Sequence, residues 1–283
     1  MEEITILKEK PKGFPEVIYK FRDWKNEKHR RLILQNELYL SSPKDFNDPF
    51  DCRIPEDFTS LNSVEKIEAY AENSVQRHSP MLQMMGIDLD AKKSEIIERL
   101  NGKPKEIQLE NEQWLFAEQD ARYGIISFSC IWNNLLLWSH YAANHTGFCV
   151  GFDEEMLRSL PKFQMGGEIS YRKDFPVITP MLTLNNEKRE ILSRAISEAF
   201  TKADDWRYEK EYRLLKLFYP NIPTNENRII TVPDGFFKEV ILGLTFPVND
   251  VHSMIEIANQ KEIPIYQAQK IPFKFRLTRV QLN

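Results

Sequence analysis

The stretch Trp206-Arg-Tyr-Glu-Lys-Glu-Tyr-Arg213 mixes aromatic and charged residues and runs directly into a leucine-rich segment. Aromatic residues followed by an apolar run predict a β-strand. Side chains on a strand alternate between its two faces. We therefore expect one face to carry Glu209, Glu211 and Arg213, and the other to carry Tyr208, Tyr212 and Leu214.

Two carboxylates two positions apart on such a strand influence each other's ionisation. A nearby like charge disfavours the ionised form, so either Glu209 or Glu211 would hold its proton more tightly. With Arg213 beside them, the two glutamates suit charge stabilisation or proton transfer in a cleft. The alternative is a solvated charged face on an edge strand, because ion pairs with a purely structural role are common.

The whole chain has the composition of an ordinary globular protein. Its 283 residues are 42% hydrophobic and 28% charged, which suffices for one large domain or two small ones. The net charge of −4 gives no global basic footprint for nucleic acid, although a local basic patch is compatible with it. Neither GxGxxG nor GxxxxGK[ST] occurs, so we expect no glycine-rich phosphate loop.

The cysteines and the N-terminal segment indicate a cytoplasmic protein. Cys52, Cys130 and Cys149 are odd in number and far apart, which fits reduced thiols better than disulfides. There is no CxxC and no HExxH motif, so we expect no metal site. The segment MEEITILKEKPKG is charged and lacks the apolar region of a signal peptide. No apolar run approaches the roughly 18 residues of a membrane helix.

Local patterns predict strands and helices along the chain. β-prone runs predict strands at 17–21, 37–42, 124–130, 148–152, 168–171 (after a Gly166-Gly167 turn), 228–232, 239–242, 264–268 and 273–279. Caps and apolar spacing predict helices at 26–35, 134–144, 185–200, 251–260 and through residues 60–122. We therefore expect a single α+β domain over residues 1–283, with a mixed, mostly antiparallel sheet and a helical insert at 60–122.

Polar side chains on the central strand and on the helix after it are further candidates for a site. The strand at 124–130 carries Ser127 and Ser129 on one face. An unpaired buried polar group costs roughly 1–3 kcal/mol, so these hydroxyls need partners, either in the protein or on a ligand. The following helix carries Tyr141 on its apolar stripe and His140 one position off it. Taken alone, His140 is better explained as a half-buried histidine with satisfied hydrogen bonds.

Four stretches in chain order resemble the family of domains of unknown function numbered 2971. They are IYKFR at 18–22, LYLSSPKDFNDPFD at 38–51, ISFSC with LWSHYAANHTGFCVGFD within 126–153, and WRYEKEYRL at 206–214. The resemblance covers most of the chain, but the family name implies little chemistry.

The chain also resembles, more distantly, ADP-ribosyltransferases of the Arg–Ser–Glu type. That family shows a basic or aromatic residue on a first strand, Ser-x-Ser on a second strand and Glu-x-Glu before a third. The matching positions are Tyr19, Lys20 or Arg22, then Ser127-Phe-Ser129, then Glu209-Lys-Glu211. The first motif is ambiguous, since three residues fit it. The resemblance implies an ADP-ribosyltransferase-like fold and NAD as a substrate.

The resemblance also implies roles for the carboxylates and serines. Cleavage of the nicotinamide–ribose bond generates an oxocarbenium-like centre, as glycoside hydrolysis does. By resemblance, Glu211 stabilises that centre, and Glu209 orients or deprotonates the acceptor. Ser127, with Ser129 as the second serine of the motif, holds Glu211 or the ribose.

The remaining candidates would bind the other parts of NAD. By resemblance, Lys20 or Arg22 meets the pyrophosphate through charge-assisted hydrogen bonds. Tyr141 or Tyr19 stacks on the nicotinamide ring. His140 contacts the adenosine ribose.

We therefore predict a cytoplasmic NAD-dependent ADP-ribosyltransferase that modifies a protein or nucleic-acid acceptor, as a toxin or a phage-defence effector. The competing hypothesis is a non-enzymatic binding or regulatory module of a bacterial defence system, which the acidic net charge and the Met- and aromatic-rich helices at 80–120 favour. A third hypothesis is a metal-independent nuclease that uses His140, Glu209 and Glu211. The shortage of basic residues around these motifs argues against it.

Overall fold

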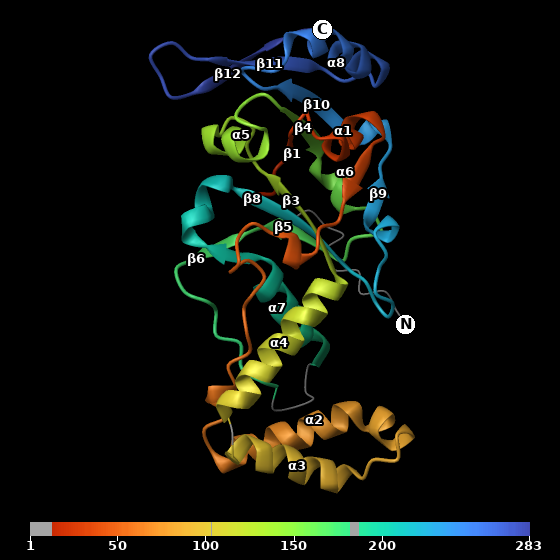
Figure 1. Cartoon of the computed structure of the whole chain (residues 1–283), viewed down its shortest axis with the longest axis vertical. Coiled ribbons are helices and arrows are strands. Elements are labelled where there is room, and N and C mark those ends of the chain that lie inside the picture. The colour runs from red at the N-terminus through yellow and green to blue at the C-terminus, as the bar shows by residue number, and fades with distance from the viewer. Residues whose placement is uncertain (1–12, 103, 182–186) are drawn as a thin grey trace. The chain divides into compact units, whose positions relative to one another are not determined.

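The computed structural model describes residues 13–102, 104–181 and 187–283 (Figure 1). Its contacts divide the chain into two compact units. The first unit takes in the residues up to Phe46, Ala121–Tyr171 and Lys202–Asn283, and the second takes in Asn47–Asp120 and Arg172–Thr201. Each unit is therefore built from stretches that are far apart in the sequence.

The first unit is built on an eight-stranded sheet with the order β12-β11-β10-β4-β1-β3-β8-β5. The strands are β1 (Val17–Arg22), β3 (Tyr123–Ser129), β4 (Phe148–Asp153), β5 (Met165–Glu168), β8 (Glu211–Leu217), β10 (Phe237–Leu242), β11 (Ile265–Lys270) and β12 (Leu277–Gln281). Neighbouring strands pair antiparallel except β10 and β11, which are connected through α8 (Val248–Gln260). The expected α+β fold with a mixed, mostly antiparallel sheet is confirmed.

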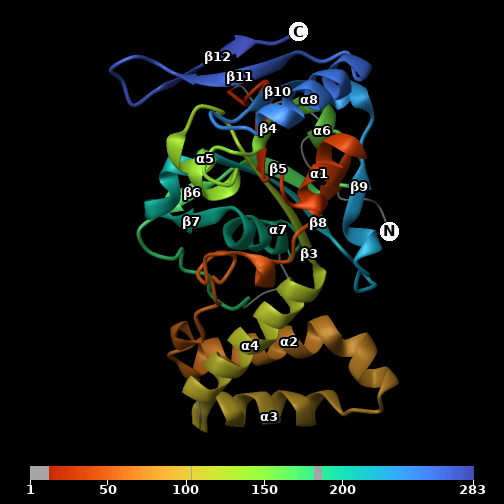
Figure 2. The same cartoon turned by 45° about the horizontal axis from the view of Figure 1, so that its top comes forward.

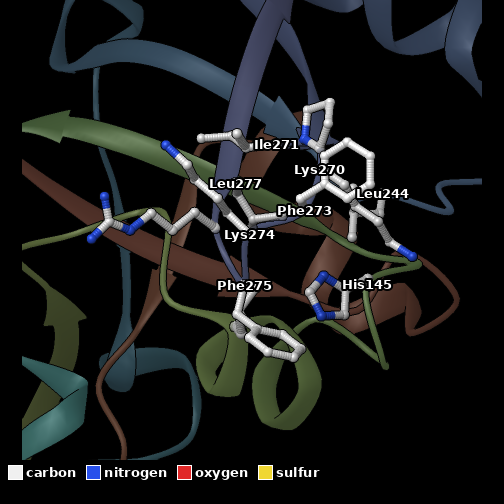
Figure 3. Close-up of a pocket in the computed structure, with 11 residues that line it drawn as sticks. His145, Leu244, Lys270, Ile271, Phe273, Lys274, Phe275 and Leu277 are labelled. Atoms are coloured by element: carbon white, nitrogen blue, oxygen red, sulfur yellow. The ribbon is translucent and has the colours of Figure 1, made fainter.

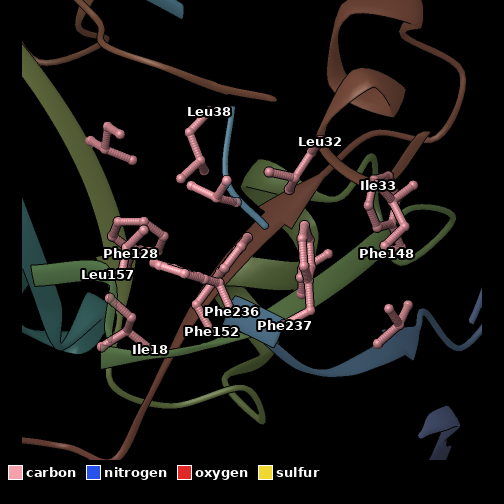
Figure 4. Close-up of a cluster of buried hydrophobic side chains, with 14 of the residues drawn as sticks. Ile18, Leu32, Ile33, Leu38, Phe128, Phe148, Phe152, Leu157, Phe236 and Phe237 are labelled. Atoms are coloured by element: carbon pink, nitrogen blue, oxygen red, sulfur yellow. The ribbon is translucent and has the colours of Figure 1, made fainter. Parts of the chain in front are cut away.

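Apolar side chains cover both faces of this sheet. One face, which we call the α1 face, packs against α1 (Glu27–Leu34), α6 (Glu154–Arg158) and α8. Its strand residues alternate along the chain and include Ile18, Phe128, Phe148, Phe152 and Phe237 (Figure 4). The other face, the α5 face, packs against α5 (Leu135–Tyr141), whose Leu137 and Trp138 cluster with Phe21, Cys149 and Ile241. Strand alternation therefore assigns each strand residue to one of the two faces.

The sheet is weakly joined between β1 and β3, at a place that we call the β1–β3 seam. Tyr19 pairs with Ser129 at the one register position of this strand pair. By contrast, β1 and β4 pair at six positions and β3 and β8 at seven. At the seam, the ammonium group of Lys20 donates a hydrogen bond to the main-chain carbonyl of Ser127.

Two small sheets complete the strands. One pairs β2 (Glu37–Tyr39) with β9 (Ile229–Thr231), and the other pairs β6 (Ser170–Arg172) with β7 (Thr201–Ala203). Gly166 and Gly167, which we expected in a turn, lie in β5 opposite Leu214 and Arg213. Gly166 allows close packing of β5 on β8, because a Cβ at this position would lie 2.6 Å from the Leu214 side chain.

The second unit is mainly helical. It contains α2 (Val64–Met84), α3 (Leu89–Gly102), α7 (Glu187–Ala199) and most of α4 (Pro104–Arg122). Helices α2 and α3 lie side by side (Figure 2), and a small buried cluster consists of Phe58, Leu61, Ile67 and Leu100. Helices α2 to α4 fall within the stretch expected to be the helical insert. The contacts do not test whether the chain folds as one domain, so the single-domain assignment stays a prediction.

Two segments expected to be continuous strands contain irregular parts. WRYEKEYR begins in the 3-10 helix η3 (Asp204–Glu209), and β8 starts only at Glu211. Residues 273–276 form the tip of the β11–β12 hairpin, because the chain must reverse between these antiparallel strands. No helix in the described part of the chain combines the length and apolar character of a membrane span.

Candidate functional site

A corner in the chain, not one strand face, brings the carboxylates of Glu209 and Glu211 together. Glu209 ends η3, and Glu211 begins β8. Lys210 between them has left-handed backbone angles, φ 45° and ψ 49°, which are uncommon for a residue with a side chain. The expectation that Glu209, Glu211 and Arg213 share one strand face is therefore wrong for Glu209. The corner nevertheless directs both carboxylates to the same lysine.

Hydrogen bonds hold the main chain on both sides of Lys210. The Ser129 hydroxyl donates to the carbonyl of Glu209 at 2.7 Å. The main-chain N–H of Glu211 donates to the hydroxyl oxygen of Tyr171 at 2.8 Å. The geometry of the corner is thus fixed by side chains from other strands of the same unit.

The two carboxylates belong to a network of five side chains that we call the carboxylate cluster. Lys202 of β7 lies 2.7 Å from Glu209 Oε2 and 3.0 Å from Glu211 Oε2. Arg213 binds the other side of Glu211, with Nε at 2.6 Å from Oε1 and Nη2 at 3.2 Å from Oε2. The Tyr141 hydroxyl donates to Glu209 Oε1 at 2.7 Å. Two positive and two negative charges are therefore balanced within the cluster.

The four charged groups are removed from water. The exposed fractions are 4% for Glu209, 3% for Glu211, 6% for Lys202 and 1% for Arg213. Taking charges out of water is costly, and mutual attraction offsets that cost only when every charge has a well-placed partner. The cluster meets this condition, so loss of any one charge would leave another buried without compensation.

The environment shifts the proton affinities of the two glutamates in opposite directions. Burial by itself raises the pKa of Glu211, but the charges of Arg213 and Lys202 outweigh it and lower that pKa well below its usual range. Ser127 adds a hydrogen bond to the same carboxylate. Burial also raises the pKa of Glu209, and the Glu211 charge raises it further against the opposing effect of Lys202. Glu211 is thus held ionised, whereas Glu209 takes up a proton more readily.

Aromatic rings border the cluster along η3 and α5. The Lys202 ammonium group lies 4.8 Å from the centre of the Trp206 ring. The ring centres of Trp206 and Tyr208 are 6.0 Å apart, and that of exposed His140 lies 6.4 Å from Tyr208. Because Trp206 and Tyr208 are only half-buried, flat aromatic surfaces lie beside the buried charges.

The structure brings several residues named in the sequence analysis to this cluster. Ser127 bonds Glu211, and Ser129 bonds the main chain of Glu209. Tyr141 bonds the Glu209 carboxylate, and His140 stands at the aromatic border. The Ser-x-Ser and Glu-x-Glu motifs therefore meet across the paired strands β3 and β8.

The candidates on β1 form no described hydrogen bond with the side chains of the cluster. Tyr19 is on the α5 face, but its hydroxyl donates to Glu239 at 3.0 Å. Lys20 and Arg22 alternate with Tyr19 and so belong to the α1 face. There Lys20 lies 5.6 Å from the centre of the Phe128 ring.

Lys20 and Arg22 are nevertheless unusual cations. Neither forms an ion pair with a carboxylate among the residues that the structure describes. Burial lowers the pKa of Arg22 to about 10. Burial, and then the charge of Arg22, lower the pKa of Lys20 well below its usual value. Lys20 and Arg22 thus form no described ion pair, although the charges of Glu211 and Glu209 act on Lys20 at the β1–β3 seam.

Lys202, which joins the two carboxylates, is not among the residues predicted from the sequence. The only indication of Lys202 in the sequence is the need to balance the charges of the two glutamates. Once Glu209 and Glu211 are taken as buried and Arg213 as one partner, a second nearby cation is required. Lys202 follows the apolar segment that ends at Phe200, but the prediction of η3 as a strand concealed its proximity.

Part of the chain matches a protein family. Residues 137–214 match the model of a family described as Protein of unknown function (DUF2971). The expected resemblance to this family is thus confirmed over those residues, which include all five side chains of the carboxylate cluster. No curated protein and no solved structure matches the chain. Among the described residues, no group of three or more His, Cys, Asp or Glu side chains is placed to hold a metal ion.

Proposed function

We propose that the chain is a cytoplasmic NAD-dependent ADP-ribosyltransferase whose reacting carboxylates are Glu211 and Glu209. The observation that carries the proposal is the opposite pKa shift of two glutamates that share Lys202. Environments that push the pKa values of paired groups apart are how enzymes give two carboxylates different roles. A toxin or phage-defence role is part of the proposal as the biological setting of such an activity.

The two carboxylates divide the chemistry between them. The bond between ribose C1′ and the nicotinamide nitrogen breaks, and nicotinamide leaves with the bonding electrons. Ionised Glu211 stabilises the positive charge that develops at the ribose. An acceptor oxygen or nitrogen then bonds to C1′, and its proton passes to Glu209. A raised pKa suits Glu209 for this step, because a base is most effective when its pKa approaches the working pH.

Residues around the cluster supply the binding contacts. Ser127 fixes the orientation of Glu211 through its hydrogen bond. Lys20, which is close enough to Glu211 and Glu209 for their charges to act on its pKa, binds the pyrophosphate together with Arg22 at the β1–β3 seam. Tyr141 stacks on the nicotinamide ring, and His140 contacts the adenosine ribose. The reaction requires Glu211 to become accessible, since it is only 3% exposed.

A second candidate is a non-enzymatic binding or regulatory module. The burial of the cluster favours it, because each of its charges already has a partner within the protein. In that case the cluster only fixes the corner at Lys210, and NAD has no binding site on the chain. The two candidates therefore differ in whether NAD binds and is cleaved.

The test is incubation of the purified protein with NAD labelled in its ADP-ribose part, with and without cell lysate. We expect nicotinamide release and transfer of label, reduced at least about 100-fold in Glu211→Gln and in Glu209→Gln. NAD should also raise the unfolding temperature of the wild type, since a ligand that binds only the native state stabilises it. A binding module without an NAD site predicts no such shift.

Glu154→Gln is the matched control for loss of a buried ion pair. Glu154 is 0% exposed and pairs with Arg158, and it belongs to α6 on the α1 face. Its substitution should lower stability and keep NAD cleavage. The proposal fails if the wild type cleaves no NAD, or if Glu211→Gln cleaves it as fast as the wild type.

A further inference from the structure

The tip of the β11–β12 hairpin carries two unpartnered aromatic side chains. The exposed fractions are 108% for Phe273 and 97% for Phe275. Large apolar side chains rarely stand fully in water without a function, particularly when they lie together. The strand expected at 273–279 would have placed both rings in a sheet, whereas residues 273–276 form the hairpin tip.

The charge around these rings is opposite to that of the whole chain. Residues 263–283 contain no Asp or Glu, but they contain the cations Lys270, Lys274, Arg276 and Arg279. The full chain has a net charge of −4. The hairpin is therefore a local basic patch on an acidic protein, and it complements an anionic partner.

A cavity of about 580 Å³ opens beside the hairpin tip. Its lining consists of Leu135, His145, Leu244 and residues 270–277, all of the first unit. Figure 3 shows the rings of Phe273, Phe275 and His145 around the same space. The volume lies in the range of pockets for small planar ligands, and the mainly apolar walls suit a ring.

The wall formed by His145 is rigid and contains an unused polar atom. Ala143, Asn144 and His145 have successive left-handed φ values of 47°, 55° and 69°. The carbonyl of His145 accepts a hydrogen bond from the Thr245 N–H at 3.1 Å, which anchors the turn. Nδ1 of His145 is buried with no hydrogen-bond partner among the described residues. The anchored turn thus holds the His145 ring in a defined place at the cavity wall.

We propose that the β11–β12 hairpin binds single-stranded nucleic acid, with an unstacked base in the cavity beside His145 and phosphates on Lys270, Lys274 and Arg276. Proteins that bind single strands combine a basic surface with aromatic rings on which bases stack. Phe273 and Phe275 provide the rings, and the three cations provide the surface. The proposal rests on the proposed function in one respect: it makes nucleic acid the acceptor class.

The residues between the hairpin and the carboxylate cluster fit this assignment. Arg279 lies over the rings of Tyr266 and Trp132, at 4.3 and 5.2 Å from their centres. These rings are half-buried and belong to the α5 face, as does Tyr141 of the cluster. Stacking surfaces thus continue from the hairpin towards the reacting carboxylates.

The spacing of the strands sets the length of nucleic acid required. Five steps in the sheet order separate β11 from β8. At about 4.8 Å per step the separation is about 24 Å. A short oligonucleotide therefore suffices to reach from the hairpin to Glu211.

An anionic membrane also attracts cations and aromatic rings, but the shape of the tip favours nucleic acid. Membrane insertion needs an apolar surface that projects outward. Here the two exposed rings stand at the mouth of a cavity, and the cations Lys270 and Lys274 flank the phenylalanines. A stacked base buries its face in such a cavity while its phosphates stay at the cations.

The test is fluorescence anisotropy with labelled single strands of DNA and RNA of about 20 nucleotides, on the full chain without NAD. Phe273→Ala with Phe275→Ala should weaken binding about 30-fold, from the loss of two stacked bases. Lys270→Gln with Lys274→Gln should lower the slope of log affinity against log salt by about 1.4. Phe50→Ala, at an aromatic side chain that is 64% exposed in the second unit, is the matched control and should bind as the wild type does.

Each outcome decides between defined alternatives. The proposed site is wrong if the wild type binds neither single-stranded DNA nor single-stranded RNA. It is also wrong if the variant with Phe273→Ala and Phe275→Ala binds as tightly as the wild type. Binding to phosphatidylserine vesicles instead, lost on the same substitutions, assigns the hairpin to membranes. Because the assay contains no NAD, hairpin-dependent binding by a chain that cleaves no NAD would keep the site and sink the transferase. If label is transferred only to protein and no oligonucleotide binds, the transferase proposal stands and the nucleic-acid site is wrong.

Discussion

Lys202 is the residue on which the carboxylate cluster depends. It contacts both glutamates, at 2.7 and 3.0 Å. Arg213 binds Glu211, and Glu209 has Lys202 as its cationic partner in the cluster. Loss of this lysine would leave two buried carboxylates with one positive charge between them.

Lys202→Met should therefore destabilise the protein strongly. Removing one partner of a buried ion pair costs about 3–5 kcal/mol, and urea unfolding at pH 7 measures it. Lys238→Met is the control, since Lys238 forms an exposed pair with Asp153 at 2.9 Å, worth about 0–1 kcal/mol. Equal effects of the two substitutions would show that the cluster charges are screened by water.

The same variant should show a distinctive dependence on pH. In the wild type the lowered pKa of Glu211 adds stability that is present above the unfolded-state pKa of about 4.3 and is lost as pH falls through the folded-state pKa. Without Lys202 the pKa values of both glutamates rise, so protonation restores neutrality. The difference in free energy of unfolding between wild type and Lys202→Met should therefore become smaller from pH 7 to pH 5. If that difference is the same at both pH values, the variant is destabilised by lost packing and not by lost charge.

Two tight turns decide where the elements around the site lie. The corner at Lys210 joins η3 to β8, and the turn at 142–147 joins α5 to β4. In the second turn the N–H of Gly147 donates to the Ala142 carbonyl at 2.8 Å. A Cβ at Gly147 would lie 2.1 Å from the carbonyl oxygen of Arg22. The glycine thus allows β4 to begin directly beside β1.

Gly147→Ala should destabilise the protein by roughly 3 kcal/mol, the upper end for an inserted methyl group, because a main-chain atom blocks the space. Gly235→Ala is the control, since a Cβ at Gly235 meets nothing within 4 Å. That substitution should change stability by less than about 0.5 kcal/mol. Thermal unfolding of the two variants checks the comparison. Similar unfolding temperatures would contradict the close approach of β4 to β1.

Caps were predictable from the sequence, and these turns were not. Asn26 and Asn134 cap α1 and α5 through their side chains, as expected. Their amide oxygens accept main-chain N–H groups, a preference visible in any sequence. Lys210 and His145 adopt left-handed backbone angles although neither is glycine. No local sequence pattern predicts this conformation at these two residues. The continuous strand expected across residues 206–213 failed for this reason.

The meeting of the two motifs at the site was also accessible from the sequence. Ser127 and Glu211 reach each other because β3 and β8 pair over seven positions. The order of motifs suggested the proximity, whereas only the pairing register gives the contact. Lys202 lay outside the prediction, because its approach to the glutamates depends on the corner.

At the scale of the whole molecule, the chain divides into units with very different cores. In the first unit, five of the six residues of β4 are buried. In the second unit, Leu100 is the one buried residue of α3 among those whose burial is described. The free energy of local opening depends on the apolar contacts that break. Helix α3 should therefore open more readily than the central sheet.

Hydrogen exchange measured by mass spectrometry tests whether this difference produces independent behaviour. We expect peptides from α2 and α3 (residues 64–102) to exchange through opening that leaves peptides from β4 protected, because few buried side chains hold the helices. Addition of denaturant should raise exchange of the helices before that of the sheet. If both exchange together, through global unfolding alone, the chain is one cooperative domain, as its sequence predicts. Separate transitions would instead make the helical unit a distinct domain, free to change without unfolding the sheet that carries the carboxylate cluster.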